Sequence, residues 1–129
     1  MKIAIGCTKA GLTLKAALIN HLEAEGHEVT DLGMKADGPF VPYYEAAANV
    51  AKAVASGESE KGVIVCGTGA GSVIVANKFK GIYAVQSSSE FEASRAAIIN
   101  DANVLCLGEW ITPPQHGIEM LKTWMNSEF

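Results

Sequence analysis

The strongest constraint on the fold of this chain is an apolar run that ends in a glycine-spaced turn. Residues 61–65 (KGVIV) lead directly into residues 66–71 (CGTGAG). Such a junction is typical of a buried parallel strand that opens into a loop and then a helix. Glycine accepts positive φ without steric cost, so successive backbone N–H groups can point into one concavity. The junction therefore predicts an α/β fold with an anion-binding loop at a strand end.

Strand-like and helix-like patterns alternate along the rest of the chain. Because consecutive strands separated by helices form parallel sheets covered on both faces, the pattern predicts a three-layer α/β/α sandwich with a five-stranded parallel, Rossmann-like sheet. One domain accounts for all residues, 1–129. The expected strands are 2–7, 27–32, 61–66, 82–86 and 103–107, and the expected helices start near 12, 42, 72, 87 and 112.

Composition excludes several classes of partner. The net charge of −4 gives no basic surface for nucleic acid or an anionic membrane. No apolar stretch reaches the ~18 residues of a membrane-spanning helix, and the first residues enter a strand pattern rather than a cleavable leader. The three cysteines, an odd number, favour reduced thiols over a disulfide framework. We therefore expect a cytoplasmic protein.

The candidate site residues follow the ends of the predicted strands. Parallel strands bring their carboxyl ends to one edge of the sheet, so residues 7–9, 66–71, 86–88 and 108–110 should lie together. Cys66, as a thiolate beside the N–H groups of the glycine loop, and the Thr68 hydroxyl could together remove a proton next to a carbonyl. The alternative is a small buried cysteine that ends a core strand, with glycines that only shape a turn.

Neither a nucleotide cofactor nor a metal is expected. The glycines read G-x-G-x-G, with Ser72 where a dinucleotide fingerprint needs its last glycine, and no GxxxxGK[ST] motif is present. The three histidines lack the spacing of metal ligands.

Four motifs occur in order along the chain: GCTKAG at 6–11, CGTGAG at 66–71, ANKFKGIYA at 76–84 and NDANVLCLG at 100–108. Together they resemble the family of ribose-5-phosphate isomerase B and the galactose-6-phosphate isomerase subunits. The resemblance spans nearly the whole chain. It implies aldose–ketose isomerisation of a sugar or sugar phosphate through a cis-enediolate, without a metal. It also implies a homodimer or homotetramer in which the subunits share their sites.

The same resemblance assigns roles to individual residues. Cys66 is the proton-transferring base, and the Thr68 hydroxyl helps to stabilise the enediolate. The N–H groups of the glycine loop stabilise the same oxygen, and an aromatic residue stands near the sugar. The substrate-binding residues are then Thr8, Lys9, Gly67, Gly69, Ala70, Gly71, Tyr43 and, from the neighbouring subunit, Asn100.

Several positions depart from the family pattern. Residues 8–9 replace the Asp-His pair associated with ring opening, and Ile99 replaces a histidine. Tyr83 and Trp110 occupy positions where the family often has phosphate-binding arginines, and Arg95 is the only arginine of the chain. Arg95 is either a ligand or a solvated helix residue. Bidentate recognition of phosphate has almost no donors left.

Three hypotheses follow. The first is an active isomerase with a divergent substrate that is unphosphorylated or short. The second is a non-catalytic homologue that serves as a partner subunit or a sugar-binding module. The third is an isomerase of a conventional sugar phosphate, which Lys9, the glycine loop and lysines across a subunit boundary would hold. The presence of both Cys66 and Thr68 favours the enzyme hypotheses.

Overall fold

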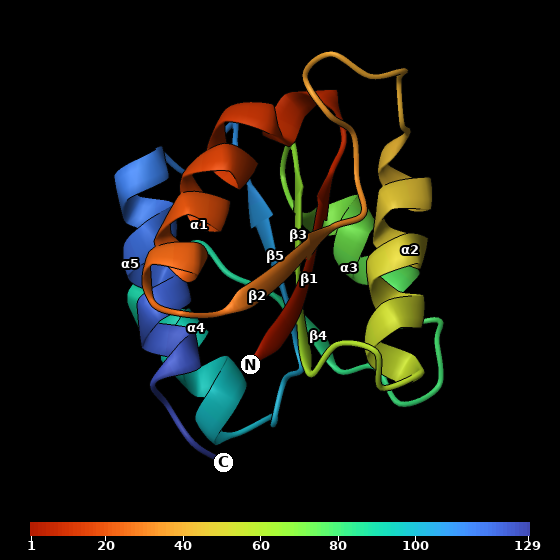
Figure 1. Ribbon diagram of the computed structural model, residues 1–129. Helices are drawn as coiled ribbons and strands as arrows, with labels where there is room; N and C mark the ends of the chain where they lie inside the picture. Colours follow the sequence, from red (N-terminus) through yellow and green to blue (C-terminus); the bar gives the residue numbers. More distant parts are fainter.

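The computed structural model describes all residues, 1–129, and contains one five-stranded parallel sheet (Figure 1). The strand order is β2-β1-β3-β5-β4, and every pairing is parallel. The predicted sheet is thereby confirmed. Its strands are β1 (Lys2–Cys7), β2 (Glu28–Asp31), β3 (Lys61–Cys66), β4 (Ala84–Gln86) and β5 (Val104–Gly108).

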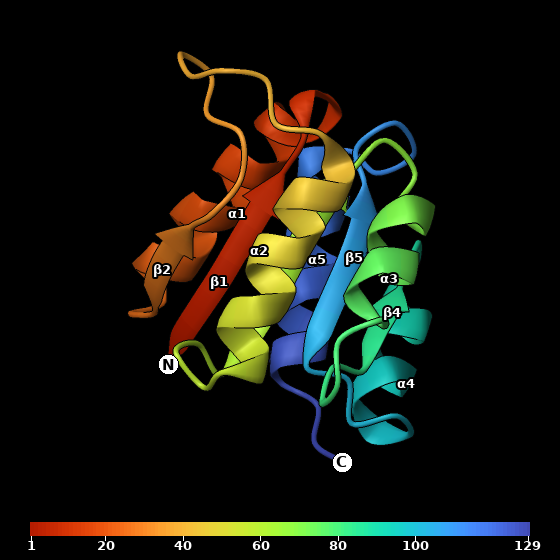
Figure 2. The same cartoon turned by 90° about the vertical axis from the view of Figure 1, so that its right-hand side faces the viewer.

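Helices cover both faces of the sheet (Figure 2). One face carries α1, α4 and α5, and the other carries α2 and α3. This is the predicted α/β/α sandwich. None of the helices combines the length and the apolar character needed to cross a bilayer. Their bounds are α1 (Leu12–Ala24), α2 (Tyr43–Ala55), α3 (Ala70–Ala76), α4 (Glu90–Ile98) and α5 (Pro114–Met125), with a short 3-10 helix, η1 (Lys9–Gly11), before α1.

The alternation of side chains along each strand separates two hydrophobic cores. In β3, Val63 and Val65 pack on the side of α1 and α5, where Trp124 is fully buried. Ile64 points to the opposite face and packs with Val50 of α2. Cys66 belongs to neither core, because it stands at the edge where β3 ends.

The main differences from prediction lie around α3. The helix begins at Ala70 rather than near 72, because Gly69 adopts φ 89° and completes the turn there. Strand β4 begins at Ala84 rather than at 82. The Asn77 amide explains this, since it donates to Ala84 O and accepts from Ala84 N, both at 2.8 Å, and so fixes a turn before the strand. Asn77 therefore has a structural role at the start of β4.

The order in which strands are added to the sheet reverses between β1 and β3. From β1 the chain continues to β2 on one side, and β3 then pairs on the other side. Loops that leave neighbouring strands in opposite directions separate at this point and form a crevice, which is the usual ligand site of open α/β sheets. The loop after β2 stays close to this crevice, because Met34 N donates to Cys7 O at 2.8 Å.

Candidate active site

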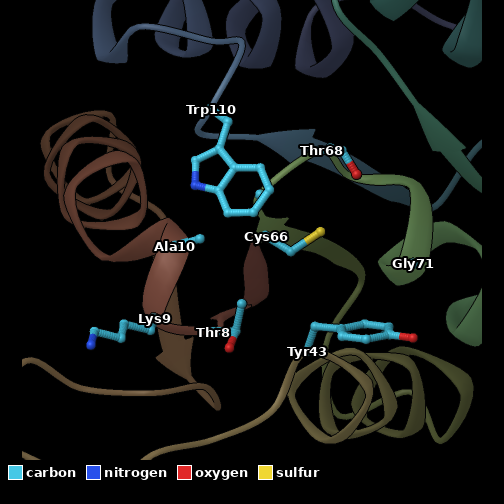
Figure 3. Close-up of a pocket in the computed structure, with 9 residues that line it drawn as sticks. Thr8, Lys9, Ala10, Tyr43, Cys66, Thr68, Gly71 and Trp110 are labelled. Atoms are coloured by element: carbon cyan, nitrogen blue, oxygen red, sulfur yellow. The ribbon is translucent and has the colours of Figure 1, made fainter.

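A cavity of about 710 Å³ opens at the carboxyl ends of β1, β3 and β5 (Figure 3). It lies at the reversal point of the sheet and receives residues from four separate parts of the chain. The loop after β1, the glycine loop after β3, the start of α2 and the loop after β5 each contribute. The lining residues are Thr8, Lys9, Ala10, Tyr43, Cys66, Gly67, Thr68, Gly71 and Trp110.

Cys66 lies at the floor of this cavity. It is the last residue of β3, its exposed fraction is 5 %, and its Sγ accepts a hydrogen bond from Gly69 N at 3.1 Å. In Figure 3 the sulfur points toward the side of Thr68 and Gly71. The sulfur thus has a backbone N–H partner on one side and the cavity on the other. The position of Cys66 therefore suits proton transfer.

The other two cysteines are enclosed in the cores. Cys7 and Cys106 both have an exposed fraction of 0 %. Burial raises the pKa of the Cys7 thiol from 9.0 to about 11, and burial also raises the pKa of Cys106. Both thiols therefore stay protonated near neutral pH. Only Cys66 combines a thiol with an open cavity.

Thr68 and the surrounding backbone supply hydrogen-bond donors. The Thr68 hydroxyl accepts from Ala70 N at 3.2 Å, which leaves its own proton available. The N–H groups of Gly69 and Ala70 are occupied within the loop, by Cys66 Sγ and by Thr68 Oγ1. Within residues 67–72, the backbone N–H groups that have no hydrogen-bond partner in the protein are those of Gly67, Thr68, Gly71 and Ser72. A cradle of this kind binds an oxyanion.

Two glycines of the loop also lie in direct contact with aromatic rings. A Cβ on Gly67 would lie 2.7 Å from Trp110 Cε3, and a Cβ on Gly71 would lie 2.5 Å from Tyr43 Cε2. Any side chain at either position would collide with the ring. Trp110 and Tyr43 thus form two facing walls with Cys66 between them (Figure 3).

The loop after β1 closes another side of the cavity. Thr8 Oγ1 donates to Val41 O at 2.7 Å and so links this loop to the segment before α2. Lys9 is exposed and forms no ion pair, and in Figure 3 its ammonium group points away from Cys66. Lys9 is the only cationic residue that lines the cavity.

Gly69 and Ala70 of the glycine loop do not line the cavity, and three candidate residues from other parts of the chain also lie outside it. Asn100 follows α4 and precedes β5, so it stands at the opposite edge of the sheet. Arg95 stacks its guanidinium on the Phe91 ring of the same helix, 4.6 Å from the ring centroid. Tyr83 precedes β4 at the edge where Asn100 lies. Within one subunit, neither Asn100 nor Arg95 contributes to the site.

Two residues near the site have roles that the sequence did not predict. Ala10 lines the cavity, but an alanine in a loop indicates no chemistry. Glu109 accepts a hydrogen bond from Leu14 N at 2.6 Å and thereby caps the start of α1 from the loop after β5. Leu14 and Glu109 are 95 positions apart in the chain, so no local sequence pattern could predict this cap.

The fold and the site together define an α/β protein with a thiol at the floor of an open cavity, and with unpaired backbone N–H groups beside it, where the strand order of the sheet reverses. The model of the Ribose/Galactose Isomerase family matches residues 3–129. This chain belongs to that family of sugar isomerases.

Its relatives differ in substrate. A 4-deoxy-4-sulfo-D-erythrose isomerase from Clostridium sp. (strain MSTE9) is 41 % identical over all of this chain and 81 % of the relative. A D-erythrulose-4-phosphate isomerase from Pectobacterium atrosepticum is 36 % identical over all of this chain and 85 % of the relative. The solved structure of Clostridium thermocellum ribose-5-phosphate isomerase B superposes with a TM-score of 0.96 at 38 % identity, and covers all of this chain and 86 % of that one.

Proposed function

We propose that this protein interconverts the aldose and ketose forms of a short sugar derivative, of about four carbons, through a cis-enediolate. The observation that carries the proposal is the placement of the Cys66 thiol, the Thr68 hydroxyl and unpaired backbone N–H groups around one cavity. The four-carbon substrates named for two of its relatives support the short chain length.

In this mechanism the Cys66 thiolate removes the proton from the carbon next to the carbonyl. The electron pair of that C–H bond forms the C=C bond of the enediolate, and the carbonyl π electrons move to oxygen. The N–H groups of Gly67 and Gly71, with the Thr68 hydroxyl, stabilise the resulting oxyanion. The thiol then returns its proton to the former carbonyl carbon, while a proton moves between the two oxygens. The scheme uses no metal.

The terminal group of the substrate meets little positive charge. Lys9 alone lines the cavity as a cation, and the single arginine lies elsewhere. Each charge-assisted hydrogen bond contributes roughly 1.5–3 kcal/mol, so the absence of two or three costs orders of magnitude in affinity for phosphate. We expect phosphorylated sugars to be preferred over unphosphorylated ones by less than about a hundredfold. A larger preference would support the conventional sugar-phosphate hypothesis instead.

Solvent exchange tests the reaction directly. Tetroses, pentoses and their ketoses, free and phosphorylated, are incubated with the enzyme in heavy water, and deuterium next to the carbonyl is followed by NMR. Cys66→Ala should reduce exchange by at least ~10²-fold, the contribution of a general base. Thr68→Ser, which keeps a hydroxyl, should lose far less than Thr68→Ala. Exchange that persists in Cys66→Ala would reject Cys66 as the base.

A second candidate function is a non-catalytic sugar-binding module or partner subunit. One observation favours it: the residues that line the cavity include no Asp, Glu or His to act as a second acid or base. A protein of this kind would bind sugars without any deuterium incorporation. Calorimetry on the same panel distinguishes binding alone from binding with exchange.

We further propose a homodimer or larger homo-oligomer whose subunits share their sites. Asn100 stands far from the cavity of its own subunit and is exposed, so only the cavity of another subunit is open to it. Exposed apolar side chains at Ile98 and Ile99 precede this position directly, Phe91 is exposed at the other end of α4, and such side chains favour a covered surface.

A further inference from the structure

We propose that Trp110 determines how long a substrate the site accepts. The inference rests on the proposed function, because it concerns the substrate of the same cavity. It follows from the packing of the indole ring on Gly67, from the hydrogen bonds that hold its loop, and from the direction in which the Cys66 sulfur points.

The indole ring packs against the backbone of Gly67 rather than against a flexible side chain. Its Cδ2, Cε3 and Cζ3 atoms would lie 2.7–2.8 Å from a Cβ on Gly67, so the benzene half of the ring packs directly on that glycine. Because nothing but Gly67 fits beneath it, the ring cannot move closer to the strand. The remaining surface is open, with an exposed fraction of 74 % for Trp110.

The loop that carries the ring is fixed to the end of β3 and to the start of α1. Trp110 N donates to Gly67 O at 3.0 Å, and Glu109 N donates to Cys66 O at 2.8 Å. The Glu109 carboxylate is itself held by Leu14 N at the start of α1. The backbone of Trp110 is therefore fixed to Cys66 and Gly67, and the indole packed on Gly67 forms one wall of the cavity.

The orientation of Cys66 places this wall at the distal end of the substrate. The sulfur points toward Thr68 and Gly71 (Figure 3), so the two carbons that exchange the proton must lie on that side. Tyr43, seated on Gly71, limits the cavity there. The rest of the sugar chain then extends across the cavity toward Trp110.

An indole ring at the distal end of the substrate distinguishes substrates by the length of their carbon chain. One additional carbon in a fixed apolar pocket changes the specificity constant by ~10–200-fold. Trp110 is thus expected to admit four carbons and to disfavour a fifth. Removal of the indole should relax this limit without changing the base or the oxyanion cradle.

The test compares four-carbon and five-carbon substrates in wild type and Trp110→Ala. For Trp110→Ala we expect the ratio of kcat/KM for the pentose over the tetrose derivative to rise at least ~10-fold. Trp110→Phe should lie between the two. The control is Ile111→Ala, since Ile111 is exposed, neighbours Trp110 and does not line the cavity. Equal losses on both substrates in Trp110→Ala would overturn the proposal.

A binding measurement separates this proposal from the proposed function. Four-carbon and five-carbon aldonic acids cannot isomerise, so calorimetry with these probes reports the length limit alone. If no sugar exchanges deuterium but Trp110→Ala shifts binding toward the five-carbon acid, the isomerase proposal fails and the role of Trp110 stands. If exchange is observed but neither ratio moves, the enzyme proposal stands and the role of Trp110 is rejected.

Discussion

At the residue scale, the three cysteines share a chemistry but not an environment. Cys7 is the last residue of β1 and Cys106 lies inside β5, and the two pack into opposite cores. Cys66 ends its strand at the edge of the sheet, where the chain turns sharply through Gly69. The open cavity is therefore the feature that distinguishes Cys66 from the two core cysteines.

This difference predicts the order of alkylation. Iodoacetamide reacts with thiolates, so at pH 7 it should modify Cys66 well before Cys7 or Cys106, whose burial keeps them protonated and out of reach. Peptide mass spectrometry after short exposure measures the order. Bound sugar should slow the reaction, and in urea all three should react. Equal labelling of the three in the folded protein would contradict the assignment.

Burial of Cys7 also predicts a dependence of stability on alkaline pH. Burial raises the pKa of its thiol from the ordinary 9.0 to about 11 in the folded protein, so the unfolded chain loses this proton first. The neutral thiol therefore contributes stability below pH 9, and this is lost as the pH rises toward 11. Between these limits the free energy of unfolding should fall by about 2–3 kcal/mol more in wild type than in Cys7→Ala. Urea unfolding at several pH values measures it, and parallel curves would contradict it.

At the scale of elements, one buried ion pair connects α1, β2 and the loop that borders the site. Lys15 Nζ contacts both carboxylate oxygens of Asp31, at 2.9 and 2.8 Å, and also donates to Met34 O. The Lys15 side chain is 5 % exposed and that of Asp31 is 23 % exposed. The same loop ends near Val41, whose carbonyl accepts the Thr8 hydroxyl, so the pair helps to position one wall of the cavity.

Loss of this pair should be costly. Asp31→Asn leaves the buried Lys15 ammonium without a counter-charge, and removal of one partner of a buried pair costs ~3–5 kcal/mol. Chemical denaturation of the variant measures this loss. The matched control is Glu119→Gln, which breaks the exposed contact with Lys122 at 3.9 Å and should cost ~1 kcal/mol or less. Similar losses in both variants would show that burial does not strengthen the pair.

The elements were predictable from the sequence, while the walls of the site were only partly so. The spacing of apolar residues and of glycines is a local property of the sequence. It therefore sufficed to predict β3, the turn after it and the position of Cys66 at the strand end. The packing of Trp110 on Gly67 and the hydrogen bond by which Glu109 caps α1 both join segments that are distant in the chain. Such contacts arise only when the sheet brings the strand ends together, and no local pattern encodes them.

At the scale of the whole molecule, the arrangement of α4 separates two predicted parts of one site. The helix starts after β4 and runs back along the sheet, so Asn100 reaches the amino-terminal edge while Cys66 stands at the carboxyl-terminal edge. A role for Asn100 in catalysis therefore requires a second subunit. The exposed Ile98 and Ile99 beside it are apolar side chains that association would cover.

This geometry gives a complementation test. Light scattering at micromolar concentration should give at least twice the chain mass of 13.5 kDa. If a site joins Cys66 of one subunit to Asn100 of another, Cys66→Ala and Asn100→Ala homodimers are both impaired. Subunits mixed after mild dissociation then form heterodimers in which one of two sites has both residues, which restores about a quarter of wild-type activity overall. If instead each variant keeps its own activity on mixing, or if the protein is monomeric, the subunits do not share their sites.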